Sequence, residues 1–425
     1  MNFILKKTDL LQTAGIIAFV FLLGGCGIYD KKDFTKYVNL FIGTGADGNT
    51  WPAASMPFGG VQLGPDTRLN SCGGYASADS IIQGFTHTHL NGVGEPEYRD
   101  ILFIPFTGKT YLNPMEPGKK GYGSAFEHQH ETASPGFYSV LLKDFNIQAE
   151  MTTTLRAGFH RYTFPESDSV HIIIDLAYPF GAEVLNIKKI SDTEIEGLRR
   201  SNGWAWDQYV YFVARFSKPF ESVQIAVNDK ILGGQTEAEG KNIKAVVNYK
   251  TKAGETVLVK VGISAVSAEG ARKNLEAEIP DWDFQKTKRN LEKVWNDILG
   301  KIDIEGGTVD DNKKFYTAMY HSLFHPRLFS DVNGEYPGFA DDTTVHVAEG
   351  FDYYDDMSNW DIFRAQMPLL SIIAPKEYND MVKSLIVKSE QGGWLPIFPM
   401  WNSYTSAMIG DHSSAIICDA AMKGF

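Results

Sequence analysis

The chain has 425 residues, and its 40 basic and 52 acidic side chains give a net charge of −12 at neutral pH. The acidic residues are spread along the chain, and this balance argues against a nucleic-acid-binding surface, so no nucleic acid partner is expected. Only three cysteines occur, without the paired spacing of a disulfide framework or a zinc cluster.

The first 26 residues have the pattern of a lipoprotein signal peptide. Lys6 and Lys7 precede an apolar run over residues 14–23, and Leu-Gly-Gly leads directly to Cys26. This run is too short to span the ~30 Å hydrocarbon core of a bilayer comfortably. We therefore expect cleavage before Cys26, acylation of this cysteine, and attachment to a membrane through its lipid chains. The protein would then be a cell-envelope lipoprotein, periplasmic or on the outer-membrane surface.

Residues 34–266 contain short segments of alternating polarity that turn residues separate. This pattern predicts a large antiparallel β-sandwich rather than a parallel sheet with crossover helices. The clearest expected strands cover residues 137–142, 159–164, 170–175 and 256–261.

The apolar period changes to three and four residues near Ala268, which predicts linker helices over residues 267–300 that end at Gly300. Beyond them, residues 301–425 contain no strand pattern of comparable strength. Amphipathic helices are expected at 312–325, 360–373, 378–388 and 411–423. A sandwich followed by an α/α barrel fits this order, and because so few helices do not close such a barrel, we expect the sequence to stop within it.

A glycine-rich segment, Gly43–Gly60, contains Trp51. Glycines allow close approach to a ligand, but the lysine of a phosphate-binding P-loop is missing and no strand-helix context surrounds the segment. Two interpretations stay open, a loop packed on the sandwich and a ligand-binding loop. Trp51 fits either one.

His87 and His89 would share one face of an extended strand. Two histidines suggest a metal site, but no third ligand follows at a suitable spacing. The favoured interpretation is a pair of structural histidines that form hydrogen bonds near the domain interface.

Two further segments place polar and aromatic residues at expected helix starts. Trp360 and Asp361 open one helix, and Asp411 and His412 open another. The carboxylates fit the roles of helix cap and dipole partner. They also fit a sugar site, in which Trp360 stacks on a pyranose ring and Asp361 accepts hydrogen bonds from its hydroxyl groups.

Together these segments resemble glycoside hydrolase family 92, the calcium-dependent exo-acting α-mannosidases of Bacteroidetes. The resemblance rests on four segments that occur in the same order: residues 48–59, 84–92, 358–365 and 408–412. It implies an N-terminal sandwich, a helical linker and a six-fold α/α barrel, the last incomplete in this chain, with domains at 34–266, 267–300 and 301–425.

The resemblance also implies inverting hydrolysis of terminal mannose, of α-1,2 or a related linkage, in N-glycans or mannan. Trp360, Asp361, Asp411, His412 and Trp51 are the implied substrate contacts. The catalytic carboxylates and most calcium ligands are expected downstream of Phe425, the last residue of the sequence, so the 425 residues alone are expected to be inactive. A non-catalytic glycan-binding remnant is the alternative, whereas a disaccharide phosphorylase would need a basic phosphate pocket that is not found.

Overall fold

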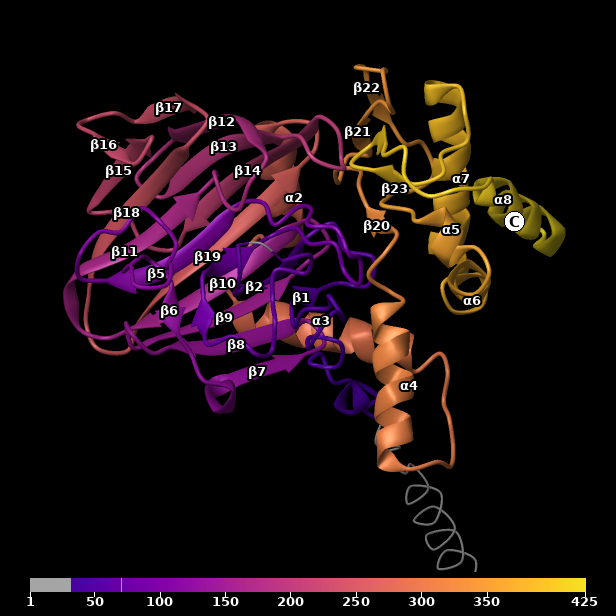
Figure 1. Ribbon diagram of the computed structural model, residues 1–425, viewed down its shortest axis with the longest axis horizontal. Coiled ribbons are helices and arrows are strands. Elements are labelled where there is room, and N and C mark those ends of the chain that lie inside the picture. The colour runs from indigo at the N-terminus through magenta and orange to yellow at the C-terminus, as the bar shows by residue number, and fades with distance from the viewer. Residues whose placement is uncertain (1–31, 70) are drawn as a thin grey trace, which may run out of the picture. The chain divides into compact units, whose positions relative to one another are not determined.

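The computed structural model describes residues 32–69 and 71–425. The signal peptide and Cys26 lie outside the described residues, so their prediction is not tested by the structure. Between residues 54 and 264, strands pair antiparallel into two large sheets (Figure 1).

The first sheet has, in spatial order, the strands β1 (Ala54–Ser55), β2 (Gln62–Asp66), β4 (Gly84–Thr86), β5 (Leu102–Thr107), β11 (Ser167–Asp175), β18 (Ile243–Thr251), β15 (Ser222–Val227) and β16 (Lys230–Leu232). The second sheet has β17 (Glu237–Gly240), β12 (Ala182–Lys189), β13 (Glu194–Ser201), β14 (Gln208–Phe216), β19 (Glu255–Ser264), β10 (Ala157–Phe164), β9 (Ile147–Thr153), β8 (Phe137–Leu142) and β7 (Glu131–Ser134). A separate pair consists of β3 (Ile81–Ile82) and β6 (Ser124–Ala125), and short 3₁₀ turns lie at Thr35–Tyr37 and His128–His130.

The two large sheets pack face to face, because alternate side chains of each strand point into a shared apolar core. The ring of Phe85, in the first sheet, lies 6.4 Å from that of Tyr138 and 6.5 Å from that of Tyr162, both in the second sheet. All three side chains are fully buried. The predicted β-sandwich is confirmed, and each of the four expected strands falls within an observed one.

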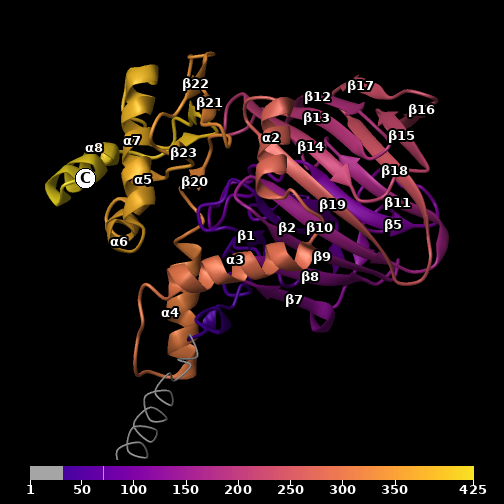
Figure 2. The same cartoon turned by 180° about the vertical axis from the view of Figure 1, so that it is seen from behind.

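Two helices follow the sandwich, α2 (Ala268–Glu278) and α3 (Phe284–Leu299), and α3 is capped at Gly300 as the sequence predicted. They pack on the outer face of the second sheet, where α2 contacts β14 and β19 and α3 contacts β9 (Figure 2). Leu275 and Phe284 are buried there against Phe159 of β10. The outer face of this sheet is therefore apolar where the helices cover it.

The rest of the chain is mainly helical. Its elements are α4 (Val309–His321), α5 (Asn359–Ile362), α6 (Gln366–Ile373), α7 (Pro375–Gly392), α8 (His412–Lys423), and the strand pairs β20 (Arg327–Leu328) with β23 (Tyr354–Asp355), β21 (Glu335–Pro337) with β22 (Val345–Val347), and β24 (Pro399–Met400) with β25 (Ser403–Tyr404). No helix within residues 32–69 and 71–425 is long and apolar enough to cross a membrane.

Prolines explain two differences from the expected helices. The helix expected over residues 360–373 is divided into α5 and α6, because Pro368 in a continuous helix would clash with the carbonyl group of the residue four positions earlier. The helix expected over 312–325 ends at His321. Pro326 disfavours the helical conformation at the preceding residue, His325, so the helix does not extend to residue 325.

The segment Gly43–Gly60 joins the sandwich to the helices. The backbone N–H of Phe58 donates a 2.6 Å hydrogen bond to the carbonyl group of Leu323, and the N–H of Leu328 donates one of 2.8 Å to Phe58. Trp295 of α3 donates from its indole to the Ser55 carbonyl at 2.7 Å. The packed-loop interpretation of this segment therefore describes most of its contacts.

Candidate functional site

The two segments that the sequence singled out in the helical region lie side by side. Asn359, the first residue of α5, donates from its side chain to Ser413 Oγ of α8 at 2.9 Å and to the Pro396 carbonyl at 3.0 Å. The ring of Phe363 stacks on that of His412, with centroids 4.2 Å apart and planes 11° from parallel. The starts of α5 and α8 are thus fixed to one another, and we refer to Trp360, Asp361, Asp411 and His412 as the α5–α8 cluster.

Trp360 and Asp361 are both exposed, which leaves them accessible to a ligand. The Asp361 carboxylate accepts a hydrogen bond from the Ser358 hydroxyl group. The Arg364 guanidinium lies 5.7 Å from the Trp360 ring centroid and 5.6 Å from that of Phe363. A cation over an aromatic face stabilises the ring's orientation, so Trp360 presents its indole in a supported position.

Asp411 has the structural role that its position suggested. It caps α8, and its carboxylate accepts hydrogen bonds from the Ser414 backbone N–H at 3.4 Å and the Ser414 hydroxyl at 2.6 Å. The residue is exposed and lines a large cavity. Capping satisfies a helix N–H, and a carboxylate oxygen still has lone pairs for a ligand.

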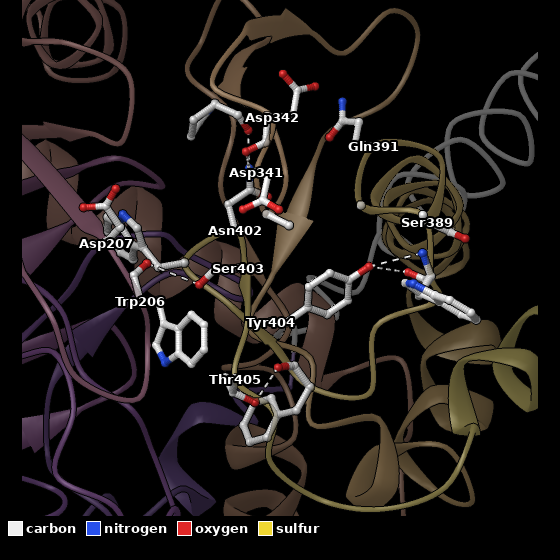
Figure 3. Close-up of a pocket in the computed structure, with 18 of the residues that line it drawn as sticks. Trp206, Asp207, Asp341, Asp342, Ser389, Gln391, Asn402, Ser403, Tyr404 and Thr405 are labelled. Carbon is white, nitrogen blue, oxygen red and sulfur yellow. Dashed lines mark hydrogen bonds between the residues drawn. The ribbon is translucent and has the colours of Figure 1, made fainter.

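This cavity has a volume of about 1260 Å³, and the sandwich and the helical region both contribute to its lining (Figure 3). From the sandwich come Trp206, Asp207, Tyr209 and Tyr211. The opposite side is formed by residues from three segments, 337–345, 389–398 and 401–406, and the cavity reaches Gly410 and Asp411. Its size and its mixture of rings with polar groups suit a small organic ligand.

A buried charged network lies beside the cavity. The Arg327 guanidinium forms an ion pair with Asp356, and Lys388 Nζ lies 3.3 Å from Asp355 Oδ1. All four side chains are at most 1% exposed. Burial lowers the pKa of Lys388 to about 8 and raises the pKa of Asp355. Separating the members of either ion pair would leave an uncompensated buried charge, which is strongly unfavourable. The ion pairs therefore hold Asp355 and Asp356, and with them the backbone that leads into α5, in place.

His87 and His89 are fully buried and form hydrogen bonds. His87 Nδ1 lies 2.7 Å from the Ile101 carbonyl oxygen, and its Nε2 lies 3.0 Å from His160 Nε2. His89 Nδ1 lies 2.9 Å from the Gln62 carbonyl oxygen. Burial lowers the pKa of His87 to about 4. The interpretation as structural histidines accounts for these contacts.

Trp51 lies away from solvent, with its side chain 1% exposed. Its ring is 4.6 Å from that of His89 and 5.1 Å from that of Phe324. Its indole N–H has no hydrogen-bond partner in the described part of the chain. Of the two roles that the sequence left open, packing describes the observed contacts, and a sugar contact by Trp51 stays a prediction.

Phe425 packs against the helices rather than in the cavity. The catalytic carboxylates are expected downstream of this residue. Its backbone N–H donates a 3.1 Å hydrogen bond to the Ala420 carbonyl of α8. Its ring meets that of Tyr378, on α7, edge-on with centroids 5.0 Å apart. These contacts belong to the end of a helix and do not test where the catalytic carboxylates lie. The position of these carboxylates downstream of Phe425 stays a prediction.

Sequence reasoning missed two features of the site, the sandwich wall of the cavity and the buried charged network. The wall includes Trp206, which is 56% exposed in the loop between β13 and β14. The sequence signal for this wall is the pair of tryptophans, Trp204 and Trp206, within three residues of one turn. The network joins Arg327 to Asp356 and Lys388 to Asp355, and nothing in the sequence indicates such long-range pairs.

Comparisons with known proteins agree with the fold. A family model described as the glycosyl hydrolase family 92 N-terminal domain matches residues 37–264, and one described as the glycosyl hydrolase family 92 catalytic domain matches residues 270–425. A family GH92 α-mannosidase of Bacteroides thetaiotaomicron, also solved in complex with mannoimidazole, is 36% identical with a TM-score of 0.88. That match covers 92% of this chain and, in the structure without the inhibitor, 54% of the mannosidase.

Two more distant proteins match to a similar extent. A family GH92 inverting mannosidase of the same bacterium is 28% identical with a TM-score of 0.82, over 92% of this chain and 53% of its own. An uncharacterized secreted glycosidase of Arthroderma benhamiae is 25% identical over 92% of this chain and 50% of its own length. The chain therefore spans about half the length of the relatives that it matches.

Proposed function

Because the chain belongs to glycosyl hydrolase family 92, we propose that it is part of an exo-acting α-mannosidase and contains the residues that bind the terminal mannose. The observation that carries this proposal is the meeting of α5 and α8, which brings Trp360 and Asp361 beside Asp411 and His412. These four residues were singled out from separate parts of the sequence. Their proximity supports one binding site.

The proposed contacts follow from the chemistry of each side chain. The exposed Trp360 indole offers a flat apolar face on which the C–H face of a pyranose ring stacks. Asp361 and Asp411 offer carboxylate oxygens that accept hydrogen bonds from sugar hydroxyl groups. The ring of His412 is fixed by its stack on Phe363, which leaves its nitrogen atoms to orient the same sugar.

We further propose an inverting mechanism. In such a mechanism one carboxylic acid protonates the leaving oxygen and a second carboxylate activates a water molecule on the opposite face of the sugar. We assign neither carboxylate to the residues up to Phe425, since this chain spans about half of its relatives. Positioned acid and base groups each contribute roughly 10²–10⁴-fold to rate, so the proposal predicts that this chain by itself does not hydrolyse mannosides.

Calcium is proposed only for the longer protein. Within residues 32–69 and 71–425, no group of three or more His, Cys, Asp or Glu side chains is arranged to hold a metal ion. Calcium takes 6–8 oxygen ligands. These residues therefore do not fit the ion on their own, and we assign them no step that depends on it.

The proposed substrates are mannose-containing glycans, N-glycans or mannan, with an α-1,2 or related linkage. The proposed location is the cell envelope, through a lipid anchor at Cys26.

An assay of mannose release from α-mannobiose tests the proposal. It compares the 425-residue chain with a form that spans the relatives' whole length, each with calcium and with a chelator. Turnover by the longer form that the chelator abolishes, with none by the shorter chain, supports the proposal. A longer form that binds α-mannobiose but never cleaves it would favour the glycan-binding remnant.

A further inference from the structure

The loop between β13 and β14 presents an aromatic surface to the cavity that the α5–α8 cluster does not explain. Trp206 is 56% exposed, whereas large aromatic rings are usually buried. Tyr209 and Tyr211 follow it on β14 and are half-buried, with ring centroids 6.3 Å apart and planes 16° from parallel. All three residues line the cavity, and we call them the aromatic wall. Figure 3 labels Trp206 among the lining residues.

The loop that carries Trp206 is firmly held. The backbone N–H of Trp204 donates to Glu97, and the Trp204 ring meets that of Phe398 edge-on at 5.0 Å. On the other side of Trp206, the Asp207 carboxylate pairs with Arg200 Nε at 2.5 Å. The exposed indole is thus pre-organised, which reduces the entropy lost when a ligand binds.

The helical region is attached directly to this loop. Ser403 Oγ donates to the carbonyl group of Trp206 at 3.2 Å, and Trp401 Nε1 donates to that of Tyr209 at 2.9 Å. These bonds fix the aromatic wall relative to the opposite side of the cavity.

A carboxylate without a partner lies on that opposite side. Asp341 is exposed and lines the cavity, and its side chain forms no hydrogen bond or ion pair with the residues that the structure describes. By contrast, the neighbouring Asp342 binds His346 Nε2 at 2.6 Å. A flat ring and a free carboxylate across a cavity match the two kinds of surface on a sugar, its C–H face and its hydroxyl groups.

We propose that the aromatic wall and Asp341 bind the sugar residues on the leaving-group side of an α-linked mannose oligosaccharide. This inference rests on the proposed function, in which the α5–α8 cluster holds the terminal mannose. The same cavity is lined by Trp206 at one side and by Asp411 of the cluster. An oligosaccharide that occupies both places would contact both the sandwich and the helical region, so the sandwich would contribute to substrate selection.

Calorimetric binding to the 425-residue chain tests this inference without any need for turnover. The probes are mannose, an α-linked mannotriose and maltotriose, and the variants are Trp206→Ala and Trp206→Phe. Trp282→Ala is the matched control, because Trp282 is 38% exposed and lies over Lys260 rather than in the cavity. Asp361→Ala reports on the terminal-mannose site.

We expect the wild-type chain to bind mannotriose about tenfold more tightly than mannose, a difference of about 1.4 kcal/mol. Trp206→Ala should bind mannotriose only as tightly as mannose, while Trp206→Phe and Trp282→Ala keep the wild-type affinity. Mannose binding should be the same in all three variants.

Unchanged affinity of Trp206→Ala for mannotriose would overturn the inference. Wild-type protein that binds maltotriose as tightly as mannotriose would also overturn it. Wild-type protein that binds mannotriose no better than mannose would overturn it as well. In each of these cases, the proposed function would still be supported if the wild-type chain binds mannose and Asp361→Ala does not. Mannose binding that survives in Asp361→Ala would count against the proposed function instead.

Discussion

The hydroxyl group of Tyr98 donates a 2.5 Å hydrogen bond to Asp356 Oδ1, and both residues are buried. Tyr98 belongs to a loop of the sandwich, and Asp356 lies just before α5. The Arg327 guanidinium pairs with the same carboxylate and lies 4.3 Å from the Tyr98 ring centroid. This contact therefore connects the sandwich to the segment that carries Trp360 and Asp361.

Replacement of Tyr98 by phenylalanine should destabilise the chain. The Asp356 carboxylate would lose a donor in a buried place, and a buried group without its partner costs about 1–3 kcal/mol. Urea unfolding measures this free energy. Tyr37→Phe is the control, since the Tyr37 hydroxyl forms no hydrogen bond with the described residues. Equal stability of the two variants would show that the Tyr98 hydroxyl contributes nothing.

The pH dependence of stability should reflect Glu97. Burial raises the pKa of Glu97 from its ordinary 4.5 to about 7. Below pH 4.5 this carboxyl group is protonated in both the folded and the unfolded chain. As the pH rises from 4.5 to 7, the unfolded chain loses the proton more readily, so the folded state is progressively destabilised.

Glu97→Gln should remove this penalty, because its amide oxygen still accepts the Trp204 N–H without a charge. We expect the variant to exceed the wild type in free energy of unfolding by about 1–3 kcal/mol at pH 8 and to equal it near pH 4.5. Unfolding curves at the two pH values measure the difference. Glu95→Gln, at an exposed position, should change neither value, and a pH-independent effect of Glu97→Gln would refute this account.

The sandwich was predictable because its information is local. Alternation of polarity over residues 137–142 and 159–164 indicates strands whatever their partners are, and both were observed. The break between α5 and α6 was harder to foresee, because Pro368 is allowed in the first turn of a helix and only tertiary packing decides where that helix begins.

The candidate site was only partly predictable. Trp360 and Asp411 were recognised by their places at expected helix starts, yet their proximity depends on the buried bond from Asn359 to Ser413. The aromatic wall was not recognised at all. Trp206 reaches the cavity through loop contacts with residues such as Ser403 that are far away in the sequence, and no periodic pattern reports such a contact.

Limited proteolysis of the full chain should give a stable fragment that ends near Gly300 rather than near residue 266. The reason is that α2 and α3 cover apolar side chains on the second sheet, where the rings of Phe159 and Phe284 lie 5.3 Å apart. Mass spectrometry of the fragments identifies the boundary. A persistent fragment that ends before Ala268 would mean that the sandwich needs neither helix.

The signal-peptide prediction concerns residues outside those described. A wild-type precursor should incorporate a fatty-acid analogue and fractionate with membranes, whereas Cys26→Ser should stay uncleaved or become soluble. Cys72→Ser serves as the control, because Cys72 lies far from the signal peptide and is not expected to be acylated. Labelling that survives in Cys26→Ser would disprove acylation at this cysteine.

The most direct test of the central claim follows the product of α-mannobiose hydrolysis by NMR, in a form that spans the relatives' whole length and in its Asp361→Ala variant. We expect β-mannose as the first product of the unaltered protein. Asp361→Ala should lose at least about 10²-fold in turnover, the scale of a misplaced substrate, yet change stability by no more than about 0.3–1 kcal/mol. Asp168→Ala, at an exposed position near the start of β11, should change neither turnover nor stability. Asp361→Ala that unfolds early but keeps its turnover would contradict the proposed site, and α-mannose as the first product would contradict the proposed mechanism.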